Sequence, residues 1–249
     1  MRVGVFDSGV GGLTVTKSLI EHRLFDEIVY FGDTAHVPYG TKDAKTIIKY
    51  SLEALEFLKS FDIDMLIVAC NTASAHALEE LRKNASFEVF GVIEPGVLAA
   101  INALHDKRSS ILVLGTKATI ASGQYEKLLI KKGYENILSL SPSLFVPIVE
   151  EGLFEGDVLE SAIEHYFGGI KQNPDAVILG CTHFPLIAKA IQNYFPKSTL
   201  IHSGDAIVEY LQTKCHLLPK ASATTLKLLA SDNLEGVKKT AKIWLHGLI

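Results

Sequence analysis

The stretch DAVILGCTHFP, residues 175–185, reads as a buried strand that runs into a polar turn and a helix. Its continuous apolar run is typical of a strand in a parallel sheet, where helices cover both faces. The run ends on Cys181, with Thr182 and His183 directly behind it. A single cysteine at such a place is most simply a core residue, because free cysteine packs like a small hydrophobe. A chemical role would need a partner elsewhere in the chain.

A second stretch with the same plan lies 111 residues earlier. DMLIVACNTASA, residues 64–75, also contains an aspartate, an apolar strand, a cysteine (Cys70), polar residues and a helix start. Upstream of each stretch another strand ends in small polar residues, VFDSGVGG with Asp7 and VLGTKAT with Thr116. This weak repeat predicts two similar halves that join near residues 105–110.

Apolar runs alternate with amphipathic stretches along the whole chain. In residues 41–61, for example, apolar side chains recur at helical spacing with Lys and Glu between them. Strands and helices in alternation predict an α/β fold with more than one mainly parallel sheet. The expected strands are residues 2–7, 27–33, 64–70, 88–93, 109–116, 136–141, 175–181, 199–203 and 224–231.

Composition excludes several classes of protein. The 249 residues are 48% hydrophobic and 21% charged, with a net charge of −4 and scattered Lys and Arg, which argues against a nucleic-acid binder. We expect no membrane span, because no run of about 18 apolar residues occurs, and no signal peptide, because Asp7 and several glycines interrupt the first twenty residues. Three cysteines without C-x-x-C spacing predict a cytoplasmic protein with reduced thiols, no disulfide scaffold and no zinc motif.

The positions of Cys70 and Cys181 in the predicted fold indicate a chemical role for both thiols. Ligands of open α/β sheets bind beyond the carboxyl ends of the strands, and both cysteines are expected to end a strand and precede a helix. A helix N-terminus lowers the pKa of a thiol beside it, and Asn71 and Thr182 are suitable first residues for such helices. We expect the two thiols to face each other across a cleft. Cys215 has no such setting, and we expect no role for it.

Other loops are expected at the same carboxyl ends of the strands, although each of their residues could also have a purely structural role. The glycine-rich DSGVGG, residues 7–12, matches neither the dinucleotide fingerprint nor a P-loop. Tyr39 lies in the turn HVPYG and could equally be a surface aromatic. Glu150 could be merely solvated, whereas His183, two places after a thiol, is a plausible proton partner.

Four motifs carry a resemblance to a known family. In their order and separation they are similar to the glutamate racemases of the aspartate/glutamate racemase family, and the resemblance extends from Val3 to beyond Asp205. Aspartate and hydantoin racemases share the two cysteines but differ in the glycine loop and the PYG turn. The motifs are VFDSGVGGLT (5–14), DTAHVPYG (33–40), ACNTASA (69–75) and LGCTHFP (179–185).

The resemblance implies interconversion of L- and D-glutamate without a cofactor or metal, to supply D-glutamate for bacterial peptidoglycan. It further implies a cytoplasmic homodimer whose partner is the small-molecule substrate, not nucleic acid or a membrane. The expected fold is two similar α/β domains with the active site in the cleft between them. The first would comprise residues 1–92 plus 207–249 and carry Cys70, and the second residues 93–206 with Cys181.

Site residues are carried over by motif. Cys70 and Cys181 would be the catalytic thiols, assisted by Asp7 and His183, with Glu150 as a further helper. One departure is His36, which stands where many members have arginine, so that the role of this side chain is open. The expected substrate contacts are Asp7, Ser8, Tyr39, Gly40, Asn71, Thr72, Thr116, Thr119, Thr182 and His183.

Two thiols suit racemisation, because the α-proton leaves one face of the carbon and a proton returns to the other. These motifs contain almost no Lys or Arg, so we expect hydroxyls and backbone N–H groups to hold the substrate carboxylates. Three alternatives stay open: a racemase of a related amino acid such as aspartate, a non-catalytic two-domain amino-acid binding protein, and a hydrolase with one nucleophilic cysteine. The binding protein would leave both thiols idle, and the hydrolase leaves one unexplained. Trp244 is expected to pack within its own domain.

Overall fold

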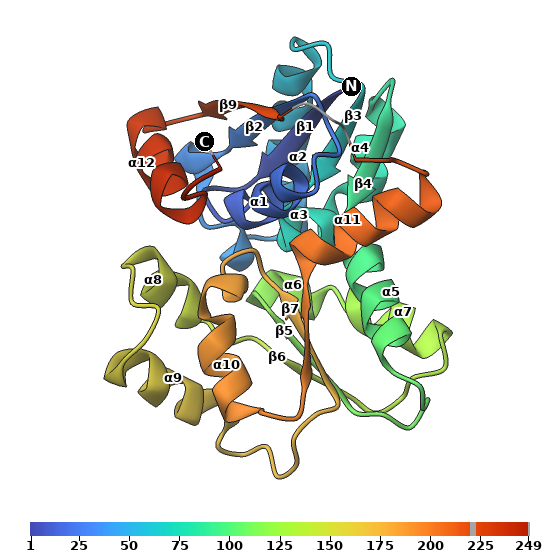
Figure 1. The fold of residues 1–249 in the computed structure, drawn as a ribbon, viewed down its shortest axis with the longest axis vertical. Helices are drawn as coiled ribbons and strands as arrows, with labels where there is room; N and C mark the ends of the chain where they lie inside the picture. The colour runs from blue at the N-terminus through green and yellow to red at the C-terminus, as the bar shows by residue number, and fades with distance from the viewer. Residues whose placement is uncertain (220–222, 249) are drawn as a thin grey trace.

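The computed structural model describes residues 1–219 and 223–248, whose nine strands form two separate parallel sheets (Figure 1). The strands lie at the nine predicted positions, most of them a residue or more shorter, and the predicted α/β class with two parallel-sheet domains is confirmed. The first sheet has the order β4 (Glu88–Gly91), β3 (Met65–Val68), β1 (Arg2–Asp7), β2 (Glu27–Gly32), β9 (Thr225–Ala230). The second has the order β6 (Ile137–Leu140), β5 (Ile111–Gly115), β7 (Ala176–Gly180), β8 (Thr199–His202).

Helices cover both sheets. The helix predicted over residues 41–61 spans Ala44–Lys59, because Asp43 caps it by accepting a 2.9 Å hydrogen bond from the Thr46 amide. The helices are α1 (Leu13–Glu21), α2 (Ala44–Lys59), α3 (Asn71–His76), α4 (Leu78–Asn84), α5 (Ile93–Ala103), α6 (Lys117–Ala121), α7 (Gln124–Lys131), α8 (Phe145–Glu150), α9 (Asp157–Phe167), α10 (Ala188–Tyr194), α11 (Ser203–Lys214) and α12 (Leu234–Trp244), with short 3-10 turns at Thr34–His36, Tyr39–Thr41 and Phe184–Ile187.

The two sheets repeat one topology. β1 lies between β2 and β3, and β5 lies in the same way between β6 and β7. In such an order the connections after the central strand and after its later neighbour run to opposite faces, which opens a crevice at their carboxyl ends. Asp7 and Cys70 border the crevice of the first sheet, and Thr116 and Cys181 that of the second. The internal repeat is therefore a repeat of fold.

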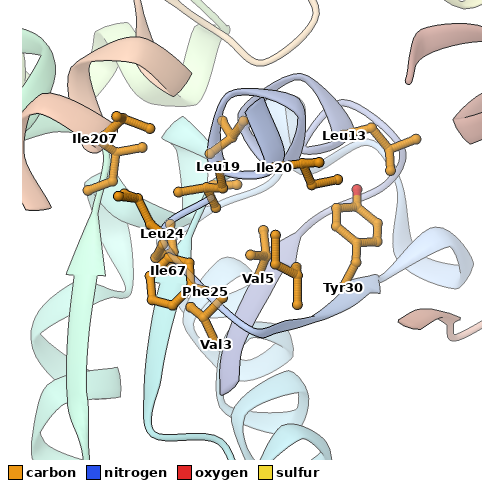
Figure 2. Packing of buried hydrophobic residues seen from close by; sticks show 14 of the residues in the cluster. Val3, Val5, Leu13, Leu19, Ile20, Leu24, Phe25, Tyr30, Ile67 and Ile207 are labelled. Atoms are coloured by element: carbon orange, nitrogen blue, oxygen red, sulfur yellow. The ribbon is translucent and has the colours of Figure 1, made fainter. Parts of the chain in front are cut away.

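Buried aliphatic and aromatic side chains fix the first sheet under α1 (Figure 2). Leu13 and Leu19 of α1 are fully buried against Val5 and Tyr30 of the sheet. Ile207 of α11 joins the same cluster from the far end of the chain. Each such side chain contributes about 1.5–3 kcal/mol by leaving water, so this packing holds β1, and with it Asp7, in place.

Two helices carry the chain between the sheets. α5 follows β4 and leads into β5, whereas α11 follows β8 and leads back toward β9. The two helices pack against each other (Figure 1). The division into residues 1–92 plus 207–249 and residues 93–206 stays a prediction. Across residues 1–219 and 223–248, no helix has the length and apolar character needed to cross a membrane.

Candidate active site

Cys70 and Cys181 line one cavity of about 330 Å³, to which both sheets contribute. All the predicted site residues line it except Asp7 and Thr119, which lie directly behind its wall. Both thiols are nearly covered, with 5% and 6% of their surface exposed. The fold thus brings together two side chains that are 111 residues apart in the sequence.

Cys70 lies two residues beyond the end of β3 and caps α3. Its sulfur accepts a 3.4 Å hydrogen bond from the Ala73 amide, and its S–H donates to the Ser8 hydroxyl at 3.5 Å. The expected lowering of the thiol pKa is wrong for this residue. Burial and the negative charge of Asp7 raise the pKa of Cys70 to about 12, and outweigh the hydrogen bonds that favour the thiolate.

Cys181 follows β7 directly and lies beside His183. Its Sγ atom is 3.8 Å from Nδ1 of His183, whose Nε2 atom is 3.1 Å from Oε1 of Glu150. The helix expected to begin at Thr182 begins at Phe184 instead and is a short 3-10 turn with Pro185 in its first turn. Three residues, 181–183, lie between β7 and this turn, and over this span the imidazole of His183 comes to face the sulfur.

The charge of His183 is set by these two partners. Burial by itself lowers the pKa of His183, but the hydrogen bonds with Cys181 and Glu150 outweigh it and raise the pKa to about 10. The imidazole is therefore a cation at neutral pH. Its positive charge lies next to the sulfur of Cys181 and would stabilise a thiolate there.

Asp7 is fully buried behind the cavity, at the end of β1. The Gly9 amide donates to its Oδ1 atom at 2.9 Å, and the Thr182 hydroxyl donates to Oδ2 at 3.4 Å. Burial raises the pKa of Asp7, against the opposing effect of the His183 charge and of these hydrogen bonds. Its carboxyl group thus connects a loop of the first domain with the residue after Cys181.

Three threonine hydroxyls meet across the two domains. Oγ1 of Thr72 lies 2.8 Å from Oγ1 of Thr116 and 3.1 Å from that of Thr119, and the latter two are 2.9 Å apart. Thr116 also caps α6 by accepting a hydrogen bond from the Thr119 amide. The three form a polar cluster in which Thr119 supports the two that reach the cavity.

Tyr39 is a buried wall residue of the cavity and not a surface aromatic. Its hydroxyl donates to Oδ2 of the buried Asp33 at 2.6 Å. The same carboxylate contacts Nδ1 of His36 and accepts from the Ser231 hydroxyl, at 2.9 and 2.8 Å. His36 itself stacks on Tyr50 and does not line the cavity, so its contacts with the cavity wall are indirect, through Asp33 and Tyr50.

The structure adds residues that sequence reasoning missed. Pro142 and Ser143 line the cavity after β6, and Val146 and Pro147 line it from α8. The first pair follows a predicted strand end, the place where ligands bind. The second pair lies four and three residues before Glu150, on the same helix face, so both signals were present in the sequence.

The cavity is poor in cations. Among the described residues that line it, Lys117 is the only Lys or Arg, and this side chain is exposed. No group of three or more His, Cys, Asp or Glu side chains within residues 1–219 and 223–248 is arranged to hold a metal ion. Hydroxyls and the His183 imidazole are therefore the main polar groups offered to a bound molecule.

Trp244 does more than pack its own domain. It is the last residue of α12, is partly buried, and contacts the core clusters of both domains. Its ring also meets the imidazole of His183 edge to face, with centroids 6.1 Å apart. Cys215 lies at the C-terminal end of α11, outside the cavity.

Comparison with known proteins establishes the family of this chain. The family model described as Asp/Glu/Hydantoin racemase matches residues 11–211, and the chain belongs to this family. Within it, the chain is 63% identical over 247 residues to a protein from a Nitratiruptor species named glutamate racemase, covering 99% of this chain and 97% of the relative. The resemblance carried by the four motifs is confirmed.

The fold is also similar to that of solved glutamate racemases. A crystal structure of glutamate racemase from Campylobacter jejuni subsp. jejuni superposes with a TM-score of 0.98 at 59% identity and full coverage of both chains. The glutamate racemase of Francisella tularensis subsp. tularensis, solved in complex with D-glutamate, gives a TM-score of 0.86 at 32% identity, with 100% and 94% coverage.

Proposed function

We propose that this chain is a glutamate racemase that interconverts L- and D-glutamate with Cys70 and Cys181 as its acid and base. The single observation that carries the proposal is that the two thiols, one from each domain, line the same cavity. Relatives covering almost the whole chain bear the name glutamate racemase, and one solved relative holds D-glutamate.

The two thiols alone account for every proton that the reaction removes and returns. A thiolate removes the α-proton from one face of the substrate, and the opposite thiol donates its proton to the other face. Substrate and product differ only in configuration, and each turnover exchanges the protonation states of the two cysteines. With a pKa of about 12, Cys70 would be the acid in the direction in which Cys181 is the base, and the two roles are reversed in the other direction.

The carboxylates of glutamate would be held mainly by hydroxyls. Ser8, Thr72, Thr116 and Thr182 are the hydroxyl-bearing candidates among the residues that line the cavity, and hydrogen bonds to a charged acceptor are stronger than those between neutral groups. Asn71, Tyr39 and Gly40 would complete the contacts, with Asp7 and Thr119 supporting them from behind. Preorganised dipoles that replace water around the substrate would favour the carbanion-like transition state.

We also infer that the enzyme works as a homodimer in the cytoplasm and supplies D-glutamate for peptidoglycan, which rests on the family resemblance. Deletion of the gene should then make growth dependent on added D-glutamate. Light scattering of the purified protein should give twice the mass of the chain. Growth of the deletion strain without D-glutamate would contradict the first inference, and a monomeric mass the second.

The decisive experiment uses L-glutamate and D-glutamate separately in deuterated water, with no added cofactor. We expect both to approach an equal mixture, with deuterium appearing at the α-carbon by NMR. L-aspartate and D-aspartate form a parallel pair of samples. Turnover of aspartate in place of glutamate would reassign the substrate, and a folded protein that leaves both amino acids unchanged would contradict the racemase proposal.

A further inference from the structure

Tyr125 joins the two halves of the site although it does not line the cavity. It is the second residue of α7 in the second domain and is 3% exposed. Its hydroxyl donates a 2.6 Å hydrogen bond to Oδ1 of Asn71 in the first domain. Asn71 directly follows Cys70 and lines the cavity.

The ring of Tyr125 packs on the residue before the other cysteine. A Cβ atom at Gly180, the last residue of β7, would lie 3.1 Å from the ring and 2.6 Å from the Leu114 carbonyl oxygen. The absence of a side chain at this position therefore lets the ring lie against the strand end. Tyr125 thus contacts the chain neighbour of Cys70 and the chain neighbour of Cys181.

A second path connects the same two points. Nδ2 of Asn71 donates to the Ser203 hydroxyl at 3.3 Å, and that hydroxyl donates to the Leu179 carbonyl of β7 at 3.3 Å. The oxygen and nitrogen of the amide thus have different partners, which fixes its orientation. Without the tyrosine hydroxyl, the amide would lose the donor that distinguishes its oxygen from its nitrogen.

We propose that Tyr125 is a positioning residue for racemisation: it orients the Asn71 amide and sets Cys70 and Cys181 in register across the domain junction. The catalytic meaning of this role rests on the proposed function, because it takes Asn71 as a substrate contact. Burial raises the pKa of Tyr125 above the ordinary value of a tyrosine, so the hydroxyl stays a donor.

The test compares Tyr125→Phe with a matched control. Tyr125→Phe keeps the ring on Gly180 and removes only the hydroxyl, and we expect kcat/KM for glutamate to fall about 10- to 100-fold through misplacement of the reacting groups. Tyr134→Phe is the control, because Tyr134 is equally buried in the same core cluster but donates to the Leu104 carbonyl. It should keep kcat/KM near that of the parent protein.

A double-mutant cycle separates positioning from a general structural effect. If Tyr125 acts through Asn71, Tyr125→Phe should lower kcat/KM much less in an Asn71→Ala background than in the parent. Ser203→Ala, which removes the other partner of the amide, should lower kcat/KM in the same direction. An equal loss in both backgrounds, or a parent-like Tyr125→Phe, would overturn the proposal.

The contact between Tyr125 and Asn71 can also be tested by a measurement that needs no substrate. The side-chain amide signal of Asn71 in a nitrogen-15 NMR spectrum, assigned through Asn71→Ala, should shift in Tyr125→Phe and stay in place in Tyr134→Phe. An unshifted signal overturns the role of Tyr125 even if glutamate is racemised. A shifted signal in a protein that does not turn over glutamate supports the contact and counts against the proposed substrate alone.

Discussion

The sulfur of Cys181 lies 3.8 Å from Nδ1 of His183. On the other side of the ring, Nε2 is held by Glu150 at 3.1 Å. Cys70 has the Asp7 carboxylate as a charged neighbour. The two thiols therefore occupy opposite electrostatic settings, which is what a pair of one base and one acid requires.

The His183 environment makes stability depend on pH. The pKa of this group is about 10 in the folded protein and about 6.5 in an unfolded chain. A raised pKa stabilises the folded state fully below the unfolded value, and this contribution is lost as the pH rises through the folded value. The unfolding free energy of the parent minus that of His183→Gln should therefore be largest below about pH 6.5 and shrink toward pH 10.

Urea denaturation at several pH values measures this difference. His165→Gln is the control, since His165 is exposed on α9 and outside the cavity. Its difference from the parent should show no such trend. A His183→Gln difference that grows with pH would mean that the imidazole is neutral in the folded protein.

Replacement of either proposed catalytic thiol should abolish racemisation. General acid–base groups contribute about 10²- to 10⁴-fold, so Cys70→Ala and Cys181→Ala should each lower kcat by at least this range in both directions. Cys215→Ala, at the third and partly exposed cysteine, should keep the parent rate. Chiral chromatography gives the rates, and circular dichroism verifies the fold. Near-normal turnover by Cys70→Ala or Cys181→Ala would contradict the proposal that the two thiols act as an acid and base pair.

Local patterns predicted most of the fold. Continuous apolar runs such as AVILG in β7 reveal strands because both faces of a parallel sheet are buried. The repeated order of strand, cysteine and helix indicated where Cys70 and Cys181 would meet. The start of the helix after Cys181 was misplaced by two residues, because Thr182 donates to Asp7 from another domain and does not cap a helix.

Properties that depend on tertiary burial could not be predicted. The pKa of Cys70 rises because the folded chain removes water from the thiol and places Asp7 nearby, whereas the sequence indicated only a helix N-terminus. Likewise, the hydroxyl of Ser231 reaches Asp33 from 198 residues away. Trp244 contacts the second domain although its helix, α12, packs against β9 of the first sheet.

The negative charge of Asp7 should be measurable in the titration of Cys70. The Asp7 charge is one of the causes that raise the pKa of Cys70, so Asp7→Asn removes a like charge and should lower this pKa. The pH dependence of iodoacetamide alkylation reports it, in a background with Cys181→Ser and Cys215→Ser. Asp157→Asn, at an exposed aspartate on α9, should leave the midpoint in place. An unchanged midpoint in Asp7→Asn would show that the carboxylate does not act on the thiol.

The hydrogen bond between Tyr39 and Asp33 should stabilise both the fold and the cavity wall. Tyr39→Phe removes a donor to a buried carboxylate, and we expect a loss of about 1.5–3 kcal/mol in unfolding free energy, together with a lower kcat/KM. Tyr50→Phe is a matched control, because it keeps the ring that stacks on His36. Equal unfolding free energies for the parent and Tyr39→Phe would contradict the role of the bond.

Close approach of the two domains requires the missing side chain at Gly11. A Cβ atom there would lie 2.2 Å from Oγ1 of Thr182 and 2.8 Å from the ring of His183. Gly11→Ala must therefore push apart the glycine loop and the residues after Cys181, and overpacking of this kind destabilises a protein by about 1–3 kcal/mol. We expect kcat/KM to fall further than stability, because the displaced groups are Thr182 and His183. In Gly169→Ala the new methyl group would have no atom of the described residues within 4 Å apart from those of its chain neighbours, so this variant should behave like the parent in thermal unfolding and in racemisation. If Gly11→Ala matched this control in both assays, the domains would not be held at the distance that the contact implies.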